Sequence, residues 1–520
     1  MAGRMHGYAR QLAVSVIITL GVAFGPGLTT PASAQPSEPS PGDPPEDPPA
    51  PSDEGAPEEA APAATPAPSP VQARTSYNDV ARAPSEEQAP GIAVPEAAPA
   101  TRPLRTTGRV LLFVPRWLFW IAVQPIRGGL WAYERYSLGA AIKGIFFNDE
   151  ETLGAYPLAF FETGFGANFG GRFIYRDLFG SDGRFRLRAS YGGRFRQQYS
   201  AKATTGTLLG DRVELELESA FVIYPKSRFF GVGNGDLVDG ATIMSPVDPL
   251  ARDTAVKTRF RHDDISVELA GVVDVGGNFS LRFSGGYIQR TFDDDAELEA
   301  DDFNIFDIYD TSRLTGYDTD LSSIGGEVEL IYDTRRGTRF YVSQANPNAG
   351  WKLSGYVGLR QGFGDDPTSY GRYGVDVQRI LDIYDGSRTL TLRTFVEGVS
   401  GDIDEVPFLE LPKLGGPHFL RGYARDRFRD RVSTMASAEY RFLVNKFLAA
   451  YAFVDTGRVF PSLGDLELDG FRLGYGGGLQ LHSATTFRGR FDVSSSKDGD
   501  LFINFTFDPV YDVSPRKESL

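Results

Sequence analysis

The chain has 520 residues, a net charge of −15 and no cysteine. The lack of cysteine excludes disulfides, thiolate zinc sites and a thiol nucleophile. The acidic charge argues against nucleic acid as a partner, because nucleic-acid binding requires a concentrated basic surface. The four histidines are scattered and there is no GxSxG, P-loop or HExxH motif, so the sequence predicts no catalytic, cofactor or metal site.

Residues 1–34 have the pattern of a secretory signal peptide. Arg4 and Arg10 precede an apolar run at residues 12–24, and Ala32-Ser33-Ala34 supplies a cleavage site. The apolar run is too short for a stable membrane span. We therefore expect an exported protein whose mature chain begins at Gln35.

Residues 35–103 hold 18 of the 34 prolines, together with many alanines and acidic residues. Such a segment buries too little apolar surface to offset its ordering entropy, so it is predicted to be a disordered tether. A proline-rich ligand for a partner domain is the alternative, and only the composition supports it. A segment of this composition is not expected to fold into a receptor module.

Residues 104–150 mix aromatic with basic side chains, including Trp117, Trp120 and Trp131 among several arginines. Two interpretations fit this segment equally well: helices at a membrane–water interface, or a short helical pair packed against the end of the following domain. No later stretch offers the ~20 uninterrupted apolar residues that a membrane-spanning helix needs.

From residue 151 to residue 510 the side chains alternate between apolar and polar. Clear examples are residues 184–191, 279–284, 390–397 and 487–493, several of which place arginines opposite aromatic residues. A soluble sandwich also alternates, but an apolar face opposite a heavily charged face is typical of a transmembrane β-barrel. At ~22 residues per strand and turn, the segment predicts an all-β antiparallel barrel of about 16 strands. Residues 511–520 form a polar C-terminal tail.

One loop of the predicted barrel, residues 293–302, is rich in aspartate and glutamate. Clustered carboxylates suit a calcium ion, but the spacing is not that of an EF-hand. We interpret the loop as a solvated acidic surface and predict no metal there.

Two motifs stand out in the C-terminal half. Leu420-Arg421-Gly422-Tyr423 lies between two predicted strands, and Phe453-Val454-Asp455-Thr456-Gly457 lies on a strand. If Ala452 and Val454 face lipid, strand alternation turns Phe453 and Asp455 inward. A loop folded into the barrel would then bring Arg421 to Asp455, while Arg425, Arg427, Arg429 and Arg431 are interpreted as ordinary loop charges.

With these motifs the chain resembles the Omp85 superfamily of outer-membrane barrels, specifically the bacterial surface antigen (D15) domain of BamA and TamA. The family carries V/I-R-G-Y/F in a loop inside the barrel and F-x-D-x-G on the wall, and Glu439-Tyr440-Arg441-Phe442 resembles the intervening E-x-R-F strand. Weaker similarities lie at residues 229–234, 333–335 and 347–350. The resemblance covers roughly residues 150–510, but the receptor (POTRA) domains of well-known members have no counterpart.

The resemblance implies a location in the outer membrane of Gram-negative type, in contact with lipid. It also implies unfolded outer-membrane or secreted proteins as clients, and a separate periplasmic receptor that replaces the missing domains. A contact between Arg421 and Asp455 would either gate the barrel or simply plug and stabilise it.

A seam between the first and last strands is the second mechanistic element. We expect the first strand to lie within residues 158–173. The last strand is expected to begin near Leu501 and to contribute Phe505 and Phe507 to the seam. The glycines Gly164, Gly166, Gly170 and Gly171 would weaken strand pairing there and permit lateral opening, or else only allow tight curvature.

Three functions from different classes remain open at this point. An assembly or translocation factor is favoured by the motifs, and a passive pore would retain the fold without the receptor domains. A lipid hydrolase is disfavoured, because His262, His418 and His482 lack an evident serine partner. We therefore expect a protein that is not an enzyme.

Overall fold

The computed structural model describes residues 124, 135, 144–178, 183–210, 212–317, 319–335, 347–364, 368–384, 386–445, 448–482 and 487–506. The predicted signal peptide, the tether, the C-terminal tail and Phe507 lie outside these residues. Most of the segment 104–150 also lies outside the described residues.

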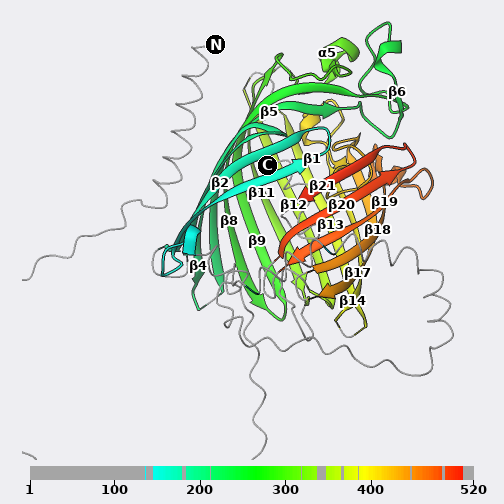
Figure 1. Ribbon diagram of the computed structural model, residues 1–520. Helices are drawn as coiled ribbons and strands as arrows, with labels where there is room; N and C mark the ends of the chain where they lie inside the picture. Colours follow the sequence, from blue (N-terminus) through cyan, green and yellow to red (C-terminus); the bar gives the residue numbers. More distant parts are fainter. Residues whose placement is uncertain are drawn as a thin grey trace, which may run out of the picture.

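Sixteen antiparallel strands form one sheet that closes into a barrel (Figure 1), which confirms the predicted fold. Each strand pairs with the next one along the barrel, and β21 returns to pair with β1. The barrel strands are β1 (Leu153–Glu162), β2 (Gly166–Leu178), β3 (Gly183–Gly192), β4 (Phe195–Leu208), β5 (Val213–Phe229), β8 (Thr258–Gly276), β9 (Phe279–Asp293), β11 (Leu321–Asp333), β12 (Gly350–Phe363), β13 (Ser369–Tyr384), β14 (Arg388–Val399), β17 (Val432–Asn445), β18 (Leu448–Phe460), β19 (Arg472–His482), β20 (Phe487–Ser496) and β21 (Leu501–Thr506).

The remaining elements are short and lie in loops. They are β6 (Asp236–Val238), β7 (Thr254–Val256), β10 (Phe303–Asn304), β15 (Lys413–Leu414), β16 (Phe428–Arg429), the helix α5 (Ile305–Ile308) and the 3₁₀ turns η4 (Gly240–Thr242), η5 (Thr311–Arg313), η6 (Phe408–Glu410) and η7 (Leu463–Asp465). Within the part of the chain that is described, no helix is long and apolar enough to cross a membrane.

The barrel wall has the two faces that the alternation predicts. Large apolar side chains such as Phe169, Tyr191 and Leu215 are exposed on the outer face. Charged side chains point inward and pair across strands, as Arg282 does with Glu268 at 2.6 Å. Because successive residues of a strand point to opposite faces, this simple alternation separates an outer surface suited to lipid from a polar interior.

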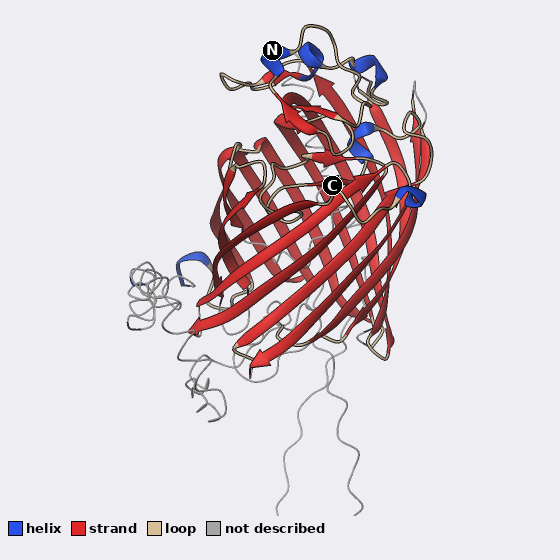
Figure 2. Cartoon of the chain, turned by 90° about the vertical axis from the view of Figure 1, so that its right-hand side faces the viewer, coloured by secondary structure: helices blue, strands red, loops and turns tan. Residues whose placement is uncertain are grey.

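The two ends of the barrel differ in the length of their connections. Hairpin turns of a few residues close most of one end, while the segments 230–257, 294–320 and 400–431 all emerge at the other (Figure 2). The short helices visible in Figure 2 gather mainly at this long-loop end. The two ends of the barrel are therefore distinguished by the length of their loops.

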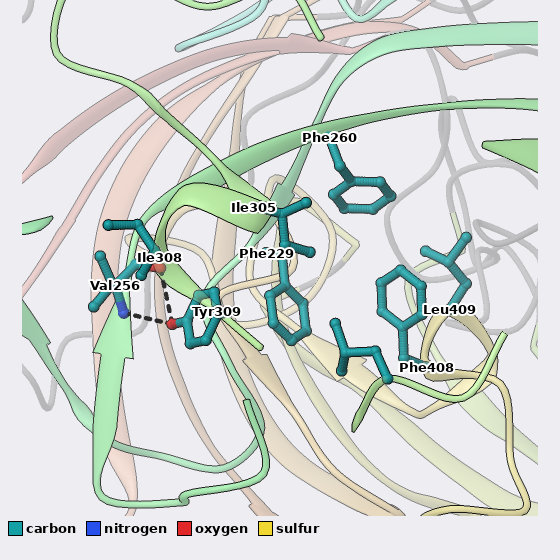
Figure 3. Close-up of a cluster of buried hydrophobic side chains, with 9 residues drawn as sticks. Phe229, Val256, Phe260, Ile305, Ile308, Tyr309, Phe408 and Leu409 are labelled. Carbon is teal, nitrogen blue, oxygen red and sulfur yellow. Dashed lines mark hydrogen bonds between the residues drawn. The ribbon is translucent and has the colours of Figure 1, made fainter. Parts of the chain in front are cut away.

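The segments 230–257 and 294–320, which we call the cap, pack together over the long-loop end. Phe229, Tyr309 and Phe408 are fully buried in the cluster drawn in Figure 3. The Tyr309 hydroxyl accepts a hydrogen bond from the Val256 amide (2.8 Å) and donates one to the Val256 carbonyl (3.1 Å). A hydrophobic core with its polar groups satisfied gives the cap a defined structure.

The acidic loop within the cap is less solvated than expected. The Asp302 carboxylate is buried, and it contacts Arg259 at 2.8 Å and Lys257 at 2.6 Å. Burial would raise the pKa of Asp302, but these two cations outweigh it and lower the pKa. The interpretation of residues 293–302 as a wholly solvated surface is therefore wrong at Asp302, because the cap folds this residue onto basic partners.

The expected first strand is in fact a hairpin of two strands. β1 ends at Glu162, a turn follows, and β2 begins at Gly166. Gly164 (φ 78°) lies in this turn, and Gly166 (φ 90°) starts the returning strand. Gly170 and Gly171 pair with β1 on one side and β3 on the other, so these four glycines do not line the seam. Glycine has no Cβ and therefore adopts the positive φ of this turn without a steric penalty.

The seam itself is short. β1 pairs with β21 only at Phe161–Phe505 and Glu162–Asn504, whereas its register with β2 runs over all ten residues of β1. The Thr163 hydroxyl extends the contact by donating to the Ile503 carbonyl (2.7 Å) and accepting from the Ile503 amide (2.9 Å). Within the described residues, the barrel is therefore closed at this point by very few hydrogen bonds.

Candidate functional site

The segment between β14 and β17, residues 400–431, folds into the barrel, and we call it the inward loop. Its first anchor is the carboxylate of Glu410, which accepts hydrogen bonds from Arg290 of β9 and from Arg372 of β13 (3.2 Å for Arg372). Burial would raise the pKa of Glu410, but the guanidinium groups around it dominate and hold that pKa well below its usual range. Glu410 thus ties the inward loop to one side of the wall as a carboxylate.

The second anchor is Arg421, which contacts the wall at β17 and β18. Its Nε and Nη2 atoms donate to the two Asp455 oxygens at 2.7 and 2.8 Å, and its backbone amide donates to Oδ2 at 3.0 Å. Its Nη1 donates to Glu439 at 2.9 Å. Both Arg421 and Asp455 are only 1% exposed. Asp455 thus binds the guanidinium through both of its oxygens, which is a strong form of ion pair, and Glu439 adds a second carboxylate.

The aromatic ring of Phe453 completes the Arg421 site. The guanidinium carbon lies 3.4 Å from the ring centroid, so one face of the cation stacks on the ring. On the same strand, Val454 is 48% exposed and points to the outer face, while Phe453 and Asp455 are buried inside. The F-x-D-x-G spacing places the stacking ring and the carboxylate on one face, because residues two apart along a strand point to the same side.

The residues around Arg421 hold the backbone of the inward loop against the wall. Leu420 is fully buried in an apolar cluster, and the Tyr423 hydroxyl donates to the Leu473 carbonyl at 3.2 Å. Gly422 has a φ of 96°, and a Cβ added there would lie 2.3 Å from the Ser495 carbonyl oxygen. In this motif Leu420 is a buried apolar side chain, Arg421 is the cation and Gly422 lets the loop backbone approach the wall closely.

The contact between the loop and β19 gives a prediction about Gly474. A Cβ at this position would lie 1.8 Å from the carbonyl oxygen of Arg421, so the loop would have to move away from the wall. We expect Gly474→Ala to destabilise the barrel by about 1–3 kcal/mol, as overpacking does elsewhere. Gly355→Ala is the matched control, because its nearest neighbour lies 3.9 Å away. Denaturant unfolding of the two variants in detergent should differ, and equal stabilities would contradict the close contact.

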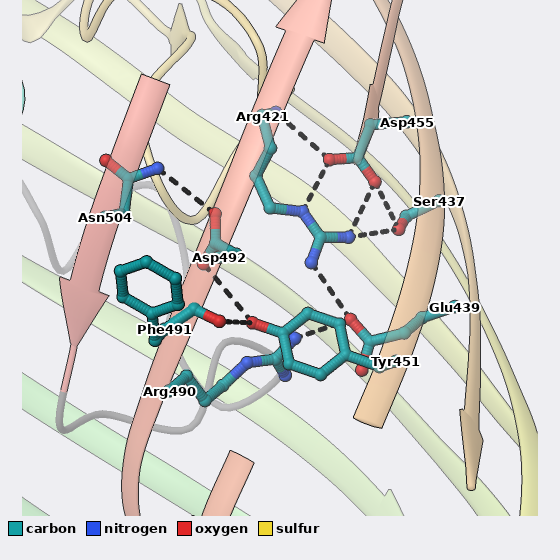
Figure 4. Close-up of polar contacts among 9 residues, drawn as sticks. All are labelled: Arg421, Ser437, Glu439, Tyr451, Asp455, Arg490, Phe491, Asp492 and Asn504. Carbon is teal, nitrogen blue, oxygen red and sulfur yellow. Dashed lines mark hydrogen bonds and ion pairs between the residues drawn. The ribbon is translucent and has the colours of Figure 1, made fainter. Parts of the chain in front are cut away.

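A polar network continues from Arg421 along the inner wall to the seam (Figure 4). Glu439 of β17 accepts from Arg490 of β20 at 2.7 Å. On the same strand Asp492 accepts from Tyr451 (3.3 Å) and from Asn504 of β21 (3.2 Å). Asn504 is one of the last residues to pair with β1. The network thus links the inward loop to the last strand of the barrel.

The third anchor of the inward loop lies on the other side of the seam. Arg425 donates to both carboxylate oxygens of Glu162, at 2.6 and 3.1 Å, and Glu162 is the last residue of β1. The inward loop therefore contacts the first strand directly and the last strand through the Arg421 network. One loop spans the point where the barrel closes.

The arginines that follow Arg421 are not ordinary loop charges, so that interpretation is wrong for three of them. Arg425, Arg427 and Arg429 are each at most 4% exposed. Arg427 donates to the Gly235 carbonyl (2.7 Å) and Arg429 to the Phe408 carbonyl (2.9 Å). They are buried because the inward loop passes through the barrel and under the cap instead of standing in solvent.

A family model for the Omp85 superfamily domain matches residues 177–507. The chain belongs to the Omp85 superfamily. The match spans most of the barrel, including the inward loop, the Asp455 strand and the network up to β21. It confirms the family that the two motifs indicate.

Solved structures give fold likenesses at low identity. BamA from Haemophilus ducreyi lacking POTRA domains 1–3 has 13% identity and a TM-score of 0.47, covering 68% of this chain and 70% of that one. CdiB from Acinetobacter baumannii has 11% identity and a TM-score of 0.41, covering 68% of this chain and 59% of that one. CdiB from Escherichia coli has 12% identity and a TM-score of 0.42, with 68% and 62% covered. A search of curated proteins finds no match.

Several members of the site of this Omp85 barrel are not found by the motif analysis. They are Glu162, Arg425, Ser437, Arg490, Asp492 and Asn504. The sequence could have indicated Arg490 and Asp492, because both occupy polar positions of a clearly alternating strand and therefore point into the barrel. Glu162 and Asn504 gave no such signal, since only the closure of the barrel brings them together.

Proposed function

We propose that this Omp85 barrel inserts or translocates polypeptides at the outer membrane, in contact with lipid, without acting as an enzyme. The inward loop acts as a strap across the seam between β1 and β21. When the strap is in place the seam is closed, and its release lets the two strands part sideways into the bilayer. Clients are unfolded outer-membrane or secreted proteins, delivered by a separate periplasmic receptor.

The observation that carries the proposal is the short seam bridged by one loop. Arg425 contacts β1, while Arg421 contacts the wall network that ends on β21. A seam with two paired positions is the weakest junction between neighbouring strands in the described barrel. Its opening would expose unpaired strand edges, which readily pair with another chain.

Photo-crosslinking in cells tests the proposal. A photoreactive residue replaces Phe161 or Phe505 at the seam, and Val357 on β12 serves as a control, since it is 65% exposed on the outer face away from the seam. We expect polypeptide adducts from the two seam positions but only lipid adducts from Val357. A restricted set of adducts would also identify the clients.

A passive pore is the alternative function. It would give no polypeptide adduct at Phe161 or Phe505, together with solute permeation through the purified barrel. Equal polypeptide labelling at Phe161, Phe505 and Val357 would also contradict the proposal, because it would indicate crowding in the membrane instead of a role for the seam.

A further inference from the structure

Two arginines of the barrel wall face outward, away from the interior. On β13 the exposed side chain of Val375 marks the outer face, and Arg379 lies four positions further along on the same face. On β14 the exposed side chain of Leu392 marks the outer face, and Arg388 lies four positions before it. Both arginines lie towards the turn that joins β13 to β14, at what we call the short-turn margin of the outer face. The role proposed for the seam makes no use of them.

An aromatic ring supports each of these guanidinium groups. Arg379 is the register partner of Trp351 on β12, and its guanidinium carbon lies 4.7 Å from the centroid of the Trp351 ring. The guanidinium carbon of Arg388 lies 5.4 Å from the ring centroid of Tyr384, its register partner on β13. A guanidinium stacked on a ring keeps the N–H donors along its edge available to a ligand. The rings therefore hold two cations in place on the outer face.

Neither cation has an acidic partner. Within the part of the chain that is described, the guanidinium groups of Arg379 and Arg388 contact no carboxylate. Asp376 points to the inner face, where it pairs with Arg393 at 2.6 Å. Asp382, in the turn beside the two arginines, accepts hydrogen bonds from two backbone amides of that turn. The register places only apolar or aromatic residues next to the two arginines on the outer face.

An outward-facing arginine at the long-loop end shows the opposite arrangement. On β18 the exposed Val454 marks the outer face, and Arg458 lies four positions further along on that face. Arg458 also stacks on a ring, that of Phe460 at 4.9 Å. It contacts two carboxylates as well, those of Glu467 and Asp469, each at 3.4 Å. The arginine at this end therefore has anions of its own, whereas Arg379 and Arg388 would need one from a ligand.

The apolar band of the outer face places the short-turn margin at the level of lipid headgroups. On β12 the exposed outward side chains run from Trp351 to Phe363, a stretch of about 40 Å along the strand. A strand tilt of about 40° reduces this to about 30 Å along the barrel axis, close to the ~25 Å apolar band of such barrels. Phe363 stacks with Tyr287 at the far margin, with ring centroids 6.0 Å apart. Trp351 and Arg379 thus lie at the edge of the band, where tryptophan and tyrosine are enriched in membrane proteins.

We propose that Arg379 and Arg388 bind the phosphate groups of membrane lipids and prefer lipids with a net negative headgroup. The guanidinium edge donates parallel hydrogen bonds to the phosphate oxygens, while the acyl chains pack against the apolar wall beside Val377 and Leu392. Bound lipid supplies the missing anion and fixes the level of β12–β14 in the bilayer. The proposal rests on the membrane location in the proposed function. It does not rest on seam opening, since β13 and β14 lie several strands from the seam.

The fluorescence of Trp351 tests this site in the full-length protein reconstituted in lipid vesicles. Trp117→Phe, Trp120→Phe and Trp131→Phe leave Trp351 as the only tryptophan. Quenching by phosphatidylglycerol or by phosphatidylcholine, each brominated in its acyl chains, then gives the relative affinity of the two lipids beside Trp351. We expect about a fivefold preference for phosphatidylglycerol, the effect of one arginine at an anionic surface, and high salt should reduce it. Equal affinities would overturn the proposal.

Variants of the two arginines separate their effect from that of the surrounding surface. Arg379→Gln should abolish the preference at Trp351, and Arg379→Lys should keep part of it, because lysine retains the charge but not the planar fork. Tyr384→Trp combined with Trp351→Phe reports on the second arginine in the same way, and Arg388→Gln should abolish its preference. A preference that survives the glutamine variants would contradict the proposal.

A reporter at the far margin and a soluble competitor complete the test. Phe363→Trp combined with Trp351→Phe moves the tryptophan to an aromatic pair that lies at the other edge of the band. We expect no preference there, and an equal preference at both margins would show a general attraction of the surface for anionic lipid. An excess of inorganic phosphate should leave the preference at Trp351 unchanged. Its loss would identify a site for free phosphate and overturn the assignment to lipid.

Discussion

Arg421→Ala is expected to destabilise the folded barrel by about 3–5 kcal/mol, because it leaves Asp455 and Glu439 buried without their shared cation. The stacking on Phe453 is lost as well. Arg421→Lys should have an intermediate effect, since lysine keeps the charge but cannot donate through a planar fork to both Asp455 oxygens. Denaturant unfolding of the purified barrel in detergent measures the three free energies of unfolding.

Arg431→Ala is the matched control for this substitution. Arg431 belongs to the same loop, but its acidic partner Asp402 is 81% exposed on its side chain, at 3.4 Å. Ion pairs of this kind contribute about 0–1 kcal/mol, so the variant should unfold almost as the natural protein does. If Arg421→Ala and Arg431→Ala had equal effects, the Arg421 site would be hydrated instead of buried.

A disulfide across the seam should abolish function. Phe161 and Phe505 are opposed in the register, and opposed residues in an antiparallel pair have Cα atoms about 4.5–5.5 Å apart, within disulfide range. With Phe161→Cys and Phe505→Cys as the only thiols, oxidation joins the first and last strands covalently. We expect cells that depend on this variant to lose outer-membrane protein assembly, and a reductant to restore it.

The control for the seam lock joins two strands that never need to part. Phe161→Cys is combined with Ala167→Cys, its partner on β2 in the first hairpin. This disulfide should leave activity unchanged under the same oxidation. Full activity of the oxidised Phe161–Phe505 pair would show that the seam stays closed during function, and would leave the barrel as a plugged pore.

Much of the fold could be predicted because the relevant information is local. Side chains of a strand alternate between two faces, so the sequence around Arg184, Phe279 or Leu390 shows an outer and an inner surface without any knowledge of the partners. The number of strands follows from the length of the alternating region. The spacing of Phe453 and Asp455 likewise predicts that both point inward.

The glycine-rich segment between Glu162 and Gly171 shows where such local information ends. Glycines carry no side chain, so this stretch has no clear alternation, and the turn at Gly164 could not be distinguished from a continuous strand. The seam was consequently placed on glycines that pair with β1 and β3.

By itself, the sequence determined the barrel class, the alternation of its wall and the chemistry of the Arg421 and Asp455 motifs. Only the tertiary structure decided that Arg425, Arg427 and Arg429 are buried, that Glu162 meets Asn504, and that one loop spans both strands of the seam. The physical reason is distance along the chain. Residues 162 and 504 become neighbours only when all sixteen strands have closed, and no local pattern encodes that register.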